Sequence, residues 1–154
     1  MIKKIIFAVL SMYSLNAMSS ELNFDELGFT MENLSDSSTS PHQVVMLTLP
    51  PENGFTSNVA VIIQTYDGTL EQYKALTMEQ FKSNDITLVN THLTKTYLII
   101  EYTGFTQGKS LHWYAKAMKK NGSIYLATGS SLGALWAKDK DKLIKSVNSL
   151  KFTP

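Results

Sequence analysis

The chain has 154 residues, of which 44% are hydrophobic and 18% are charged, and its formal net charge is +1. It contains no cysteine, eight glycines and four prolines. This composition is typical of one small globular domain. It excludes a disordered chain, a collagen-like chain, a disulfide scaffold and any cysteine-ligated zinc or iron–sulfur site.

The first nineteen residues have the pattern of a secretory signal peptide. Lys3 and Lys4 form a basic start, an apolar run follows over 5–10, and small residues stand at Ala17 and Ser19. The apolar run is too short to span a bilayer of about 30 Å, so it predicts a cleaved leader. We expect cleavage after Ser19, with a cut after Ala17 as the alternative.

Cleavage after Ser19 leaves residues 20–154 as a single domain of a periplasmic or secreted protein. No later segment reaches the ~18 consecutive apolar residues of a membrane span. A bacterial lipid anchor requires a cysteine at the cleavage site, and the chain has none. We therefore expect neither a membrane span nor a lipid anchor.

The charge of the processed chain argues against nucleic-acid binding. Loss of Lys3 and Lys4 leaves 12 lysines (14 − 2) against 13 acidic residues, which gives a net charge of −1. All basic residues are lysines, so the planar guanidinium that binds phosphate with two hydrogen bonds is absent. A nearly neutral chain without arginine is not expected to bind nucleic acid.

The first part of the processed chain is predicted to be rich in β-strands. One or two short strands are expected over 24–34, followed by a serine-rich loop over 35–41. A strand over 43–49 is ended by the proline- and glycine-containing turn over 50–54. The next strand, over 58–66, is apolar on both faces, which indicates a central strand.

A helix is expected after the Asp67-Gly68 turn. Thr69 and Gln72 have the spacing of a capping box, and the helix is predicted to end near Asn84. One face of this helix carries the apolar residues that we expect in the core, namely Leu70, Tyr73, Leu76 and Phe81.

Four further strands joined by short turns indicate an antiparallel meander. The strands are expected over 86–93, 96–103, 111–118 and 123–128, with turns over 94–95, 104–110 and 119–122. A final amphipathic helix begins near Ala134 and carries on one side Trp136, Leu143, Ile144, Val147 and Leu150. This order predicts an α+β fold in which two main helices pack on an antiparallel sheet.

Several short stretches, taken in order, resemble the PsbP-like superfamily over roughly residues 24–152. They are Phe55-Thr56-Ser57-Asn58 before Val59-Ala60-Val61, Thr69-Leu70-Glu71-Gln72-Tyr73, Ile100-Glu101-Tyr102, Ile124-Tyr125-Leu126-Ala127-Thr128-Gly129 and Val147-Asn148-Ser149-Leu150-Lys151-Phe152. The superfamily includes bacterial DcrB-like proteins, the PsbP subunit of photosystem II, the Mog nuclear-transport factors and the Eag chaperones of type VI secretion. The resemblance implies an α/β/α sandwich and proteins that bind other proteins rather than catalyse reactions.

One motif is typical of a nucleophile. Residues Gly129-Ser130-Ser131-Leu132-Gly133 match G-x-S-x-G between a predicted strand and a predicted helix. In an α/β-hydrolase the triad histidine follows the serine in the chain, but the last histidine here is His112. A turn of small residues is therefore the favoured interpretation, and a serine hydrolase that uses Ser131 is the weakest of three hypotheses.

Other chemical motifs are weaker still. The stretch over 104–110 resembles a phosphate loop but is one residue short and leads into a strand, so we expect a hairpin loop. The three histidines, His42, His92 and His112, lack the spacing of a metal site, and no metal or cofactor is predicted. Asp139 and Asp141 alternate with lysines, which predicts a solvated charged face.

Aromatic residues in predicted loops are the candidates for protein contact. These are Phe105 and Phe55, although Phe55 is also expected to fold back on the core, and Tyr114 joins them if no helix covers its face of the sheet. The leading hypothesis is a non-enzymatic periplasmic protein, monomer or weak dimer, that binds another envelope or secreted protein in an accessory, assembly or immunity role. A small-molecule or metal carrier with a pocket between sheet and helix is the alternative.

Overall fold

A computed structural model describes residues 21–24, 29–32 and 42–152, with side chains described from Val45 onward. The predicted leader over 1–19 and the serine-rich loop over 35–41 lie outside these residues. The described residues divide into two compact units, a short hairpin and the remainder from residue 42. In the hairpin, β1 (Glu21–Phe24) pairs antiparallel with β2 (Phe29–Glu32), which confirms short strands in this region.

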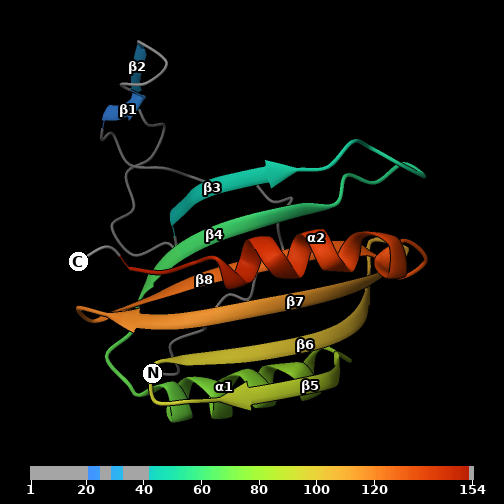
Figure 1. Cartoon of the computed structure of the whole chain (residues 1–154). Helices are drawn as coiled ribbons and strands as arrows, with labels where there is room; N and C mark the ends of the chain where they lie inside the picture. The colour runs from blue at the N-terminus through green and yellow to red at the C-terminus, as the bar shows by residue number, and fades with distance from the viewer. Residues whose placement is uncertain (1–20, 25–28, 33–41, 153–154) are drawn as a thin grey trace. The chain divides into compact units, whose positions relative to one another are not determined.

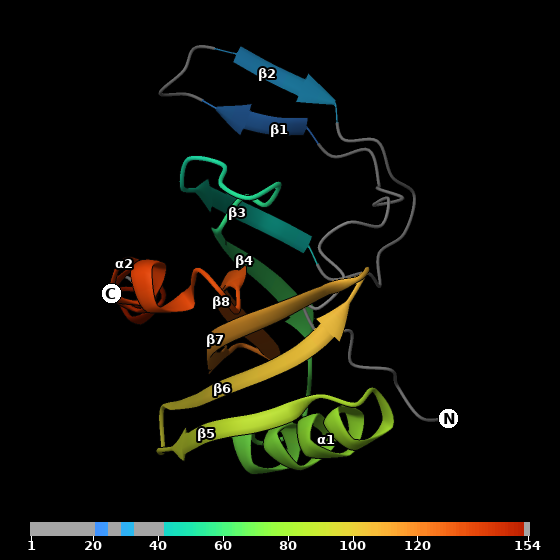
Figure 2. The same ribbon diagram turned by 90° about the vertical axis from the view of Figure 1, so that its right-hand side faces the viewer.

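The larger unit contains a six-stranded sheet in the order β3-β4-β8-β7-β6-β5, and every neighbouring pair is antiparallel. Figures 1 and 2 show the sheet with α1 on one side and α2 on the other. The predicted α+β architecture, an antiparallel sheet with two helices, is thereby confirmed. The elements are β3 (His42–Thr48), β4 (Asn58–Thr65), α1 (Leu70–Ser83), β5 (Thr87–Leu93), β6 (Tyr97–Thr106), β7 (Lys109–Lys120), β8 (Ser123–Leu132) and α2 (Trp136–Asn148).

Side-chain alternation along the strands divides the core into two clusters, one on each face of the sheet. The α1 face holds the larger cluster, which includes Tyr73, Phe81, Leu98, Ile100, Tyr102, Trp113, Ile124 and Leu126. The α2 face holds Val59, Ala127, Trp136, Leu143 and Val147. Residues of β7 alternate as predicted, with Trp113, Ala115 and Ala117 buried on the α1 face.

Helix α1 begins with the predicted capping box. The Thr69 hydroxyl accepts a hydrogen bond from the Gln72 backbone N–H at 3.2 Å, and the Gln72 side chain accepts one from the Thr69 N–H at 2.8 Å. The predicted core face is wrong at one position, because Thr77 is fully buried while Leu76 is only half-buried. Thr77 is accommodated there because its hydroxyl donates to the backbone oxygen of Tyr73 at 2.7 Å.

The predicted hairpin between these two strands is confirmed, but its predicted loop over 104–110 is too long, because β6 and β7 continue through most of it. The turn consists of Gln107 and Gly108 alone, with φ angles of 51° and 75°. Both angles are positive, as in a type I′ turn, which matches the twist of a hairpin. Gly104 lies within β6 rather than in a loop, and an added Cβ would approach the Trp113 ring to 3.3 Å.

The predicted strand-to-helix turn over 129–133 is also wrong, because β8 extends to Leu132. Gly129 lies under α2, where an added Cβ would meet the Leu143 Cβ at 3.1 Å. Glycine usually interrupts a strand, but Gly104 and Gly129 each lie within a strand and permit close packing on the sheet. Among the described residues, no helix has the length and apolar character needed to cross a membrane.

Candidate functional site

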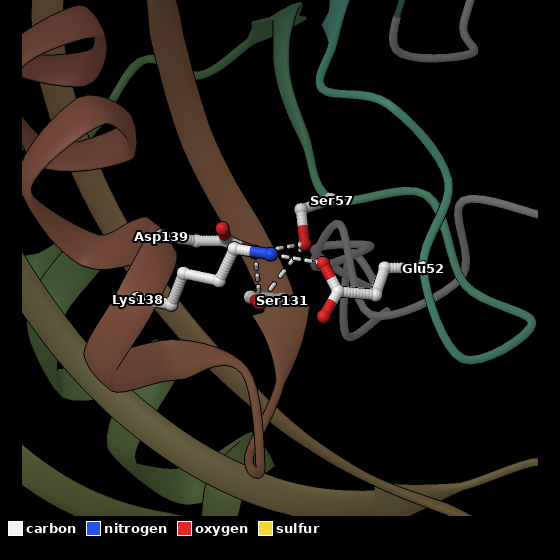
Figure 3. A network of polar contacts seen from close by, with 5 residues as sticks. All are labelled: Glu52, Ser57, Ser131, Lys138 and Asp139. Atoms are coloured by element: carbon white, nitrogen blue, oxygen red, sulfur yellow. Dashed lines mark hydrogen bonds and ion pairs between the residues drawn. The ribbon is translucent and has the colours of Figure 1, made fainter.

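A buried cluster of three polar side chains joins α2 to the sheet and to the connection between β3 and β4 (Figure 3). The Ser57 hydroxyl donates to Asp139 Oδ2 at 2.7 Å, and the Ser131 hydroxyl donates to the same oxygen at 3.1 Å. The two hydroxyl oxygens are 2.9 Å apart. The residues are exposed by 3% (Ser57), 0% (Ser131) and 7% (Asp139), so the cluster is shielded from water.

The prediction of a solvated charged face is wrong for Asp139. This residue follows Trp136 by three positions and precedes Leu143 by four, so helical periodicity places it on the apolar side of α2. Two hydroxyl donors offset the cost of burying its carboxylate. Periodicity could have identified Asp139 from the sequence, but the two serines are brought to it only by the fold.

An exposed ion pair lies next to this cluster. Lys138 Nζ donates to Glu52 Oε2, which links the start of α2 to the loop between β3 and β4 (Figure 3). The hydrogen bond with Glu52 raises the pKa of the Lys138 ammonium. Both side chains are exposed, so solvent screens the pair and it adds little to stability.

A second polar contact lies between β6, β7 and the first residue of α2. His112 Nε2 is 2.7 Å from Glu101 Oε1, and the imidazole stacks on the Trp136 ring with a centroid separation of 3.9 Å and an interplanar angle of 10°. The His112 and Glu101 side chains are exposed by only 14% and 20%. The imidazole thus fixes the start of α2 against the sheet.

The contacts of Ser131 differ from those of a nucleophilic serine, whose hydroxyl is hydrogen-bonded to a histidine base. Ser131 lies opposite His112 in the register of β7 and β8. Its hydroxyl nevertheless bonds to Ser57 and Asp139, and among the described residues no hydrogen bond joins Ser131 to a histidine. Because Ser131 is fully buried, a substrate has no access to its oxygen.

The three predicted contact aromatics have different environments. Phe105 is 73% exposed near the end of β6, beside the tight turn. Phe55 is half-buried against the α1-face cluster, and Lys109 Nζ lies 5.7 Å from its ring centroid. Tyr114 packs against the α2-face cluster, and its hydroxyl donates to Asn148 Oδ1 of α2 at 3.2 Å. Helix α2 therefore covers the face on which Tyr114 lies.

An open depression of about 510 Å³ lies near the start of α1, and its lining includes Leu70, Lys119 and Phe152. Lys119 Nζ already donates hydrogen bonds to the backbone oxygens of Asp67 and Gly68. Within the described part of the chain, no three histidine, cysteine or acidic residues lie close enough together to hold a metal ion.

No protein-family model matches the sequence, and no curated protein matches it. Solved structures similar to the chain include that of PA94, a protein of unknown function from Pseudomonas aeruginosa. This match has a TM-score of 0.67 and 12% identity, and it covers 88% of this chain and 98% of that chain. They also include the solution structure of the cyanobacterial PsbP, CyanoP, from Synechocystis sp. PCC 6803, with a TM-score of 0.46, 13% identity and coverage of 92% and 96%. The likeness to PA94 shows a shared fold alone.

Proposed function

We propose that the chain is an exported, non-enzymatic protein that binds another protein of the cell envelope or a secreted protein. The observation that carries this proposal is Phe105, a large aromatic side chain that is 73% exposed. Most aromatic residues of this size are buried in a soluble domain, and exposed ones are enriched where proteins bind one another.

The position of Phe105 suits an anchor residue. It lies in β6 opposite Ser110 of β7, one residue before the last paired position, Thr106 with Lys109. The two-residue turn that follows holds the hairpin end in one backbone conformation. Because the backbone that carries Phe105 is already paired in a hairpin, binding does not require this backbone to become ordered, which favours affinity. The partner is expected to offer an apolar pocket that accepts the ring.

The buried state of Ser131 supports a non-enzymatic role. The motif in the sequence that is typical of a nucleophile lies in the interior of the fold. There the Ser131 hydroxyl donates to Asp139 and stabilises the position of its carboxylate. Support for export comes from the leader pattern of the first nineteen residues, a basic start followed by an apolar run and small residues.

Site-specific photocrosslinking tests the binding proposal. A photoreactive phenylalanine analogue is placed at position 105 of the full chain in its own host cell, and the matched control carries the analogue at Glu79, an exposed position on α1. We expect one dominant crosslinked protein from position 105 and none of it from position 79. Identical products from both positions, or no product from position 105, would contradict the proposal.

Export is tested separately on the same cells. Fractionation followed by N-terminal sequencing is expected to give a chain that begins at Ser20, in the periplasm or the medium. A full-length chain confined to the cytoplasm would show that the leader interpretation is wrong.

A further inference from the structure

The open depression near the start of α1 lies at the opposite end of the sheet from Phe105. It has a volume of about 510 Å³ and is bordered by the start of α1, the turn between β5 and β6, the end of β7 and the segment after α2. Figure 1 shows these four segments at the same end of the sheet. Strand β6 begins beside the depression at Tyr97, and Phe105 lies eight residues further along it, which is about 26 Å at about 3.3 Å per residue. The depression is therefore separate from the surface in the proposed function.

Lysine ammonium groups give this depression a positive charge. Lys95 and Lys119 belong to its lining, and Lys120 Nζ lies 5.1 Å from the ring centroid of Phe152, which also lines it. Glu71 is the acidic residue of the lining, so three positive charges stand against one negative charge. Within the part of the chain that the structure describes, none of the three lysines forms an ion pair with an acidic side chain. The depression thus favours an anion.

Two of the lining side chains are held in position by contacts of their own. Lys119 Nζ donates to the backbone oxygens of Asp67 and Gly68, which uses two of its three N–H groups and leaves the third for a ligand. The Phe152 ring packs edge-on against the Tyr125 ring, with a centroid separation of 5.0 Å and an interplanar angle of 81°. Because these groups are already ordered, a ligand does not have to order them, which favours binding.

The remaining groups select the class of anion. Leu70, Met118 and Phe152 give the depression an apolar part beside the lysines, which suits a ligand with an apolar chain. Phosphate binds at the start of a helix when the first backbone N–H groups are unpaired. At the start of α1 these groups are used by the capping box and by the Glu71 side chain. A carboxylate does not require such a cradle, since an ammonium N–H is a sufficient donor.

We propose that the depression binds one molecule of an organic carboxylate that carries an apolar chain. The carboxylate contacts the ammonium groups of Lys119 and Lys95, and the chain lies against Leu70, Met118 and Phe152. Lys95 is exposed and has no hydrogen bond or ion pair with another described residue, so its ammonium can turn to the ligand. Because the depression is open, water reaches the bound molecule, and we expect a dissociation constant in the submillimolar range.

Calorimetric titration with three matched probes tests the ligand class. The full chain, purified as the cell produces it, is titrated with octanoate below its micelle concentration, with octanol, which lacks the charge, and with acetate, which lacks the chain. We expect saturable binding of octanoate, binding of octanol that is weaker by about threefold or more, and no binding of acetate. Failure of octanoate to bind, or equal affinities for octanoate and octanol, would overturn the proposal.

Nuclear magnetic resonance locates the bound probe on the chain. Octanoate is expected to move the backbone amide signals of Leu70 and Lys119 and to leave that of Phe105 unchanged. Signals that move at Phe105 and not at the depression would contradict the assignment of the site. Loss of the envelope partner in the crosslinking experiment has no bearing on these signals, so the two proposals succeed or fail independently.

A pair of lysine variants tests the role of charge in the depression. Lys95→Gln is the informative variant because Lys119 also holds the connection between β4 and α1, whereas Lys95 has no such contact. It is expected to weaken octanoate binding by about threefold or more. The matched control, Lys82→Gln, removes an exposed lysine in the last turn of α1 and is expected to leave binding unchanged. Equal affinities in these two variants would show that the lysines of the depression do not bind the carboxylate.

Discussion

The two helices are held on opposite faces of one sheet by different physical means. On the α1 face, Tyr73 and Phe81 of the helix meet Tyr102 and Trp113 of the sheet, and the Tyr102 and Trp113 rings stack at 5.1 Å. On the α2 face, the apolar cluster contains fewer residues, and the buried carboxylate of Asp139 lies beside it. Apolar burial is not directional, whereas hydrogen bonds to a carboxylate are. The α1 face therefore contributes bulk stability, and the α2 face fixes one position of its helix.

The largest expected effect comes from removing an aromatic side chain from the cluster on the α1 face. Trp113→Ala removes a side chain that is 2% exposed and leaves a cavity beside Tyr102, so it should cost about 3–5 kcal/mol of unfolding free energy. Urea denaturation measures this loss. The matched control, Phe105→Ala, removes an exposed aromatic ring and should change stability by less than about 0.5 kcal/mol. Similar losses in both variants would mean that Trp113 is not central to the core.

A smaller loss is expected on the polar side. Asp139→Ala removes the acceptor shared by Ser57 and Ser131, and we expect a loss of about 2–3 kcal/mol. Asp141→Ala, on the exposed side of the same helix, is the control and should have little effect. A double-mutant cycle with Ser57→Ala should show coupling of about 0.5 kcal/mol or more. Additive losses would show that the cluster does not act as a unit.

The smallest expected effect concerns the pH dependence of the free energy of unfolding, through two buried tyrosines on the α1 face. Burial raises the pKa of Tyr73, against the opposing hydrogen bond that Gln64 Nε2 donates to its hydroxyl at 2.6 Å, and burial also raises the pKa of Tyr102. Above about pH 10 the unfolded chain loses these protons while the folded chain keeps them. Stability should therefore fall as pH rises, by about 1.4 kcal/mol per pH unit for each tyrosine.

Tyr73→Phe isolates the contribution of one phenol. Urea denaturation between pH 9 and pH 11 should give a shallower loss of stability in this variant than in the unmodified chain. The slope is the informative quantity, since the variant also loses the bond from Gln64 at every pH. An unchanged slope would contradict the assignment to Tyr73.

Local signals in the sequence predicted most elements correctly, and the two wrong turns share one cause. The capping box at Thr69 fixed the start of α1, and the alternation around Trp113 identified a two-faced strand. Gly104 and Gly129 predict turns because glycine usually interrupts strands, but in the fold a tryptophan ring and a helix pack against them. The candidate site was harder, since Ser57 and Asp139 are 82 positions apart and meet only in the folded chain.

The sequence by itself determined the elements and their order, because hydrophobic period, caps and turns are properties of neighbouring residues. It also determined that an aromatic residue, Phe105, would be a candidate for protein contact. Only the tertiary structure decided that Asp139 is buried, that the Ser131 hydroxyl is used in the interior, and that β3 lies at an edge of the six-stranded sheet. These properties depend on which distant segments become neighbours, and the pairing of distant segments is set by the packing of the whole sheet.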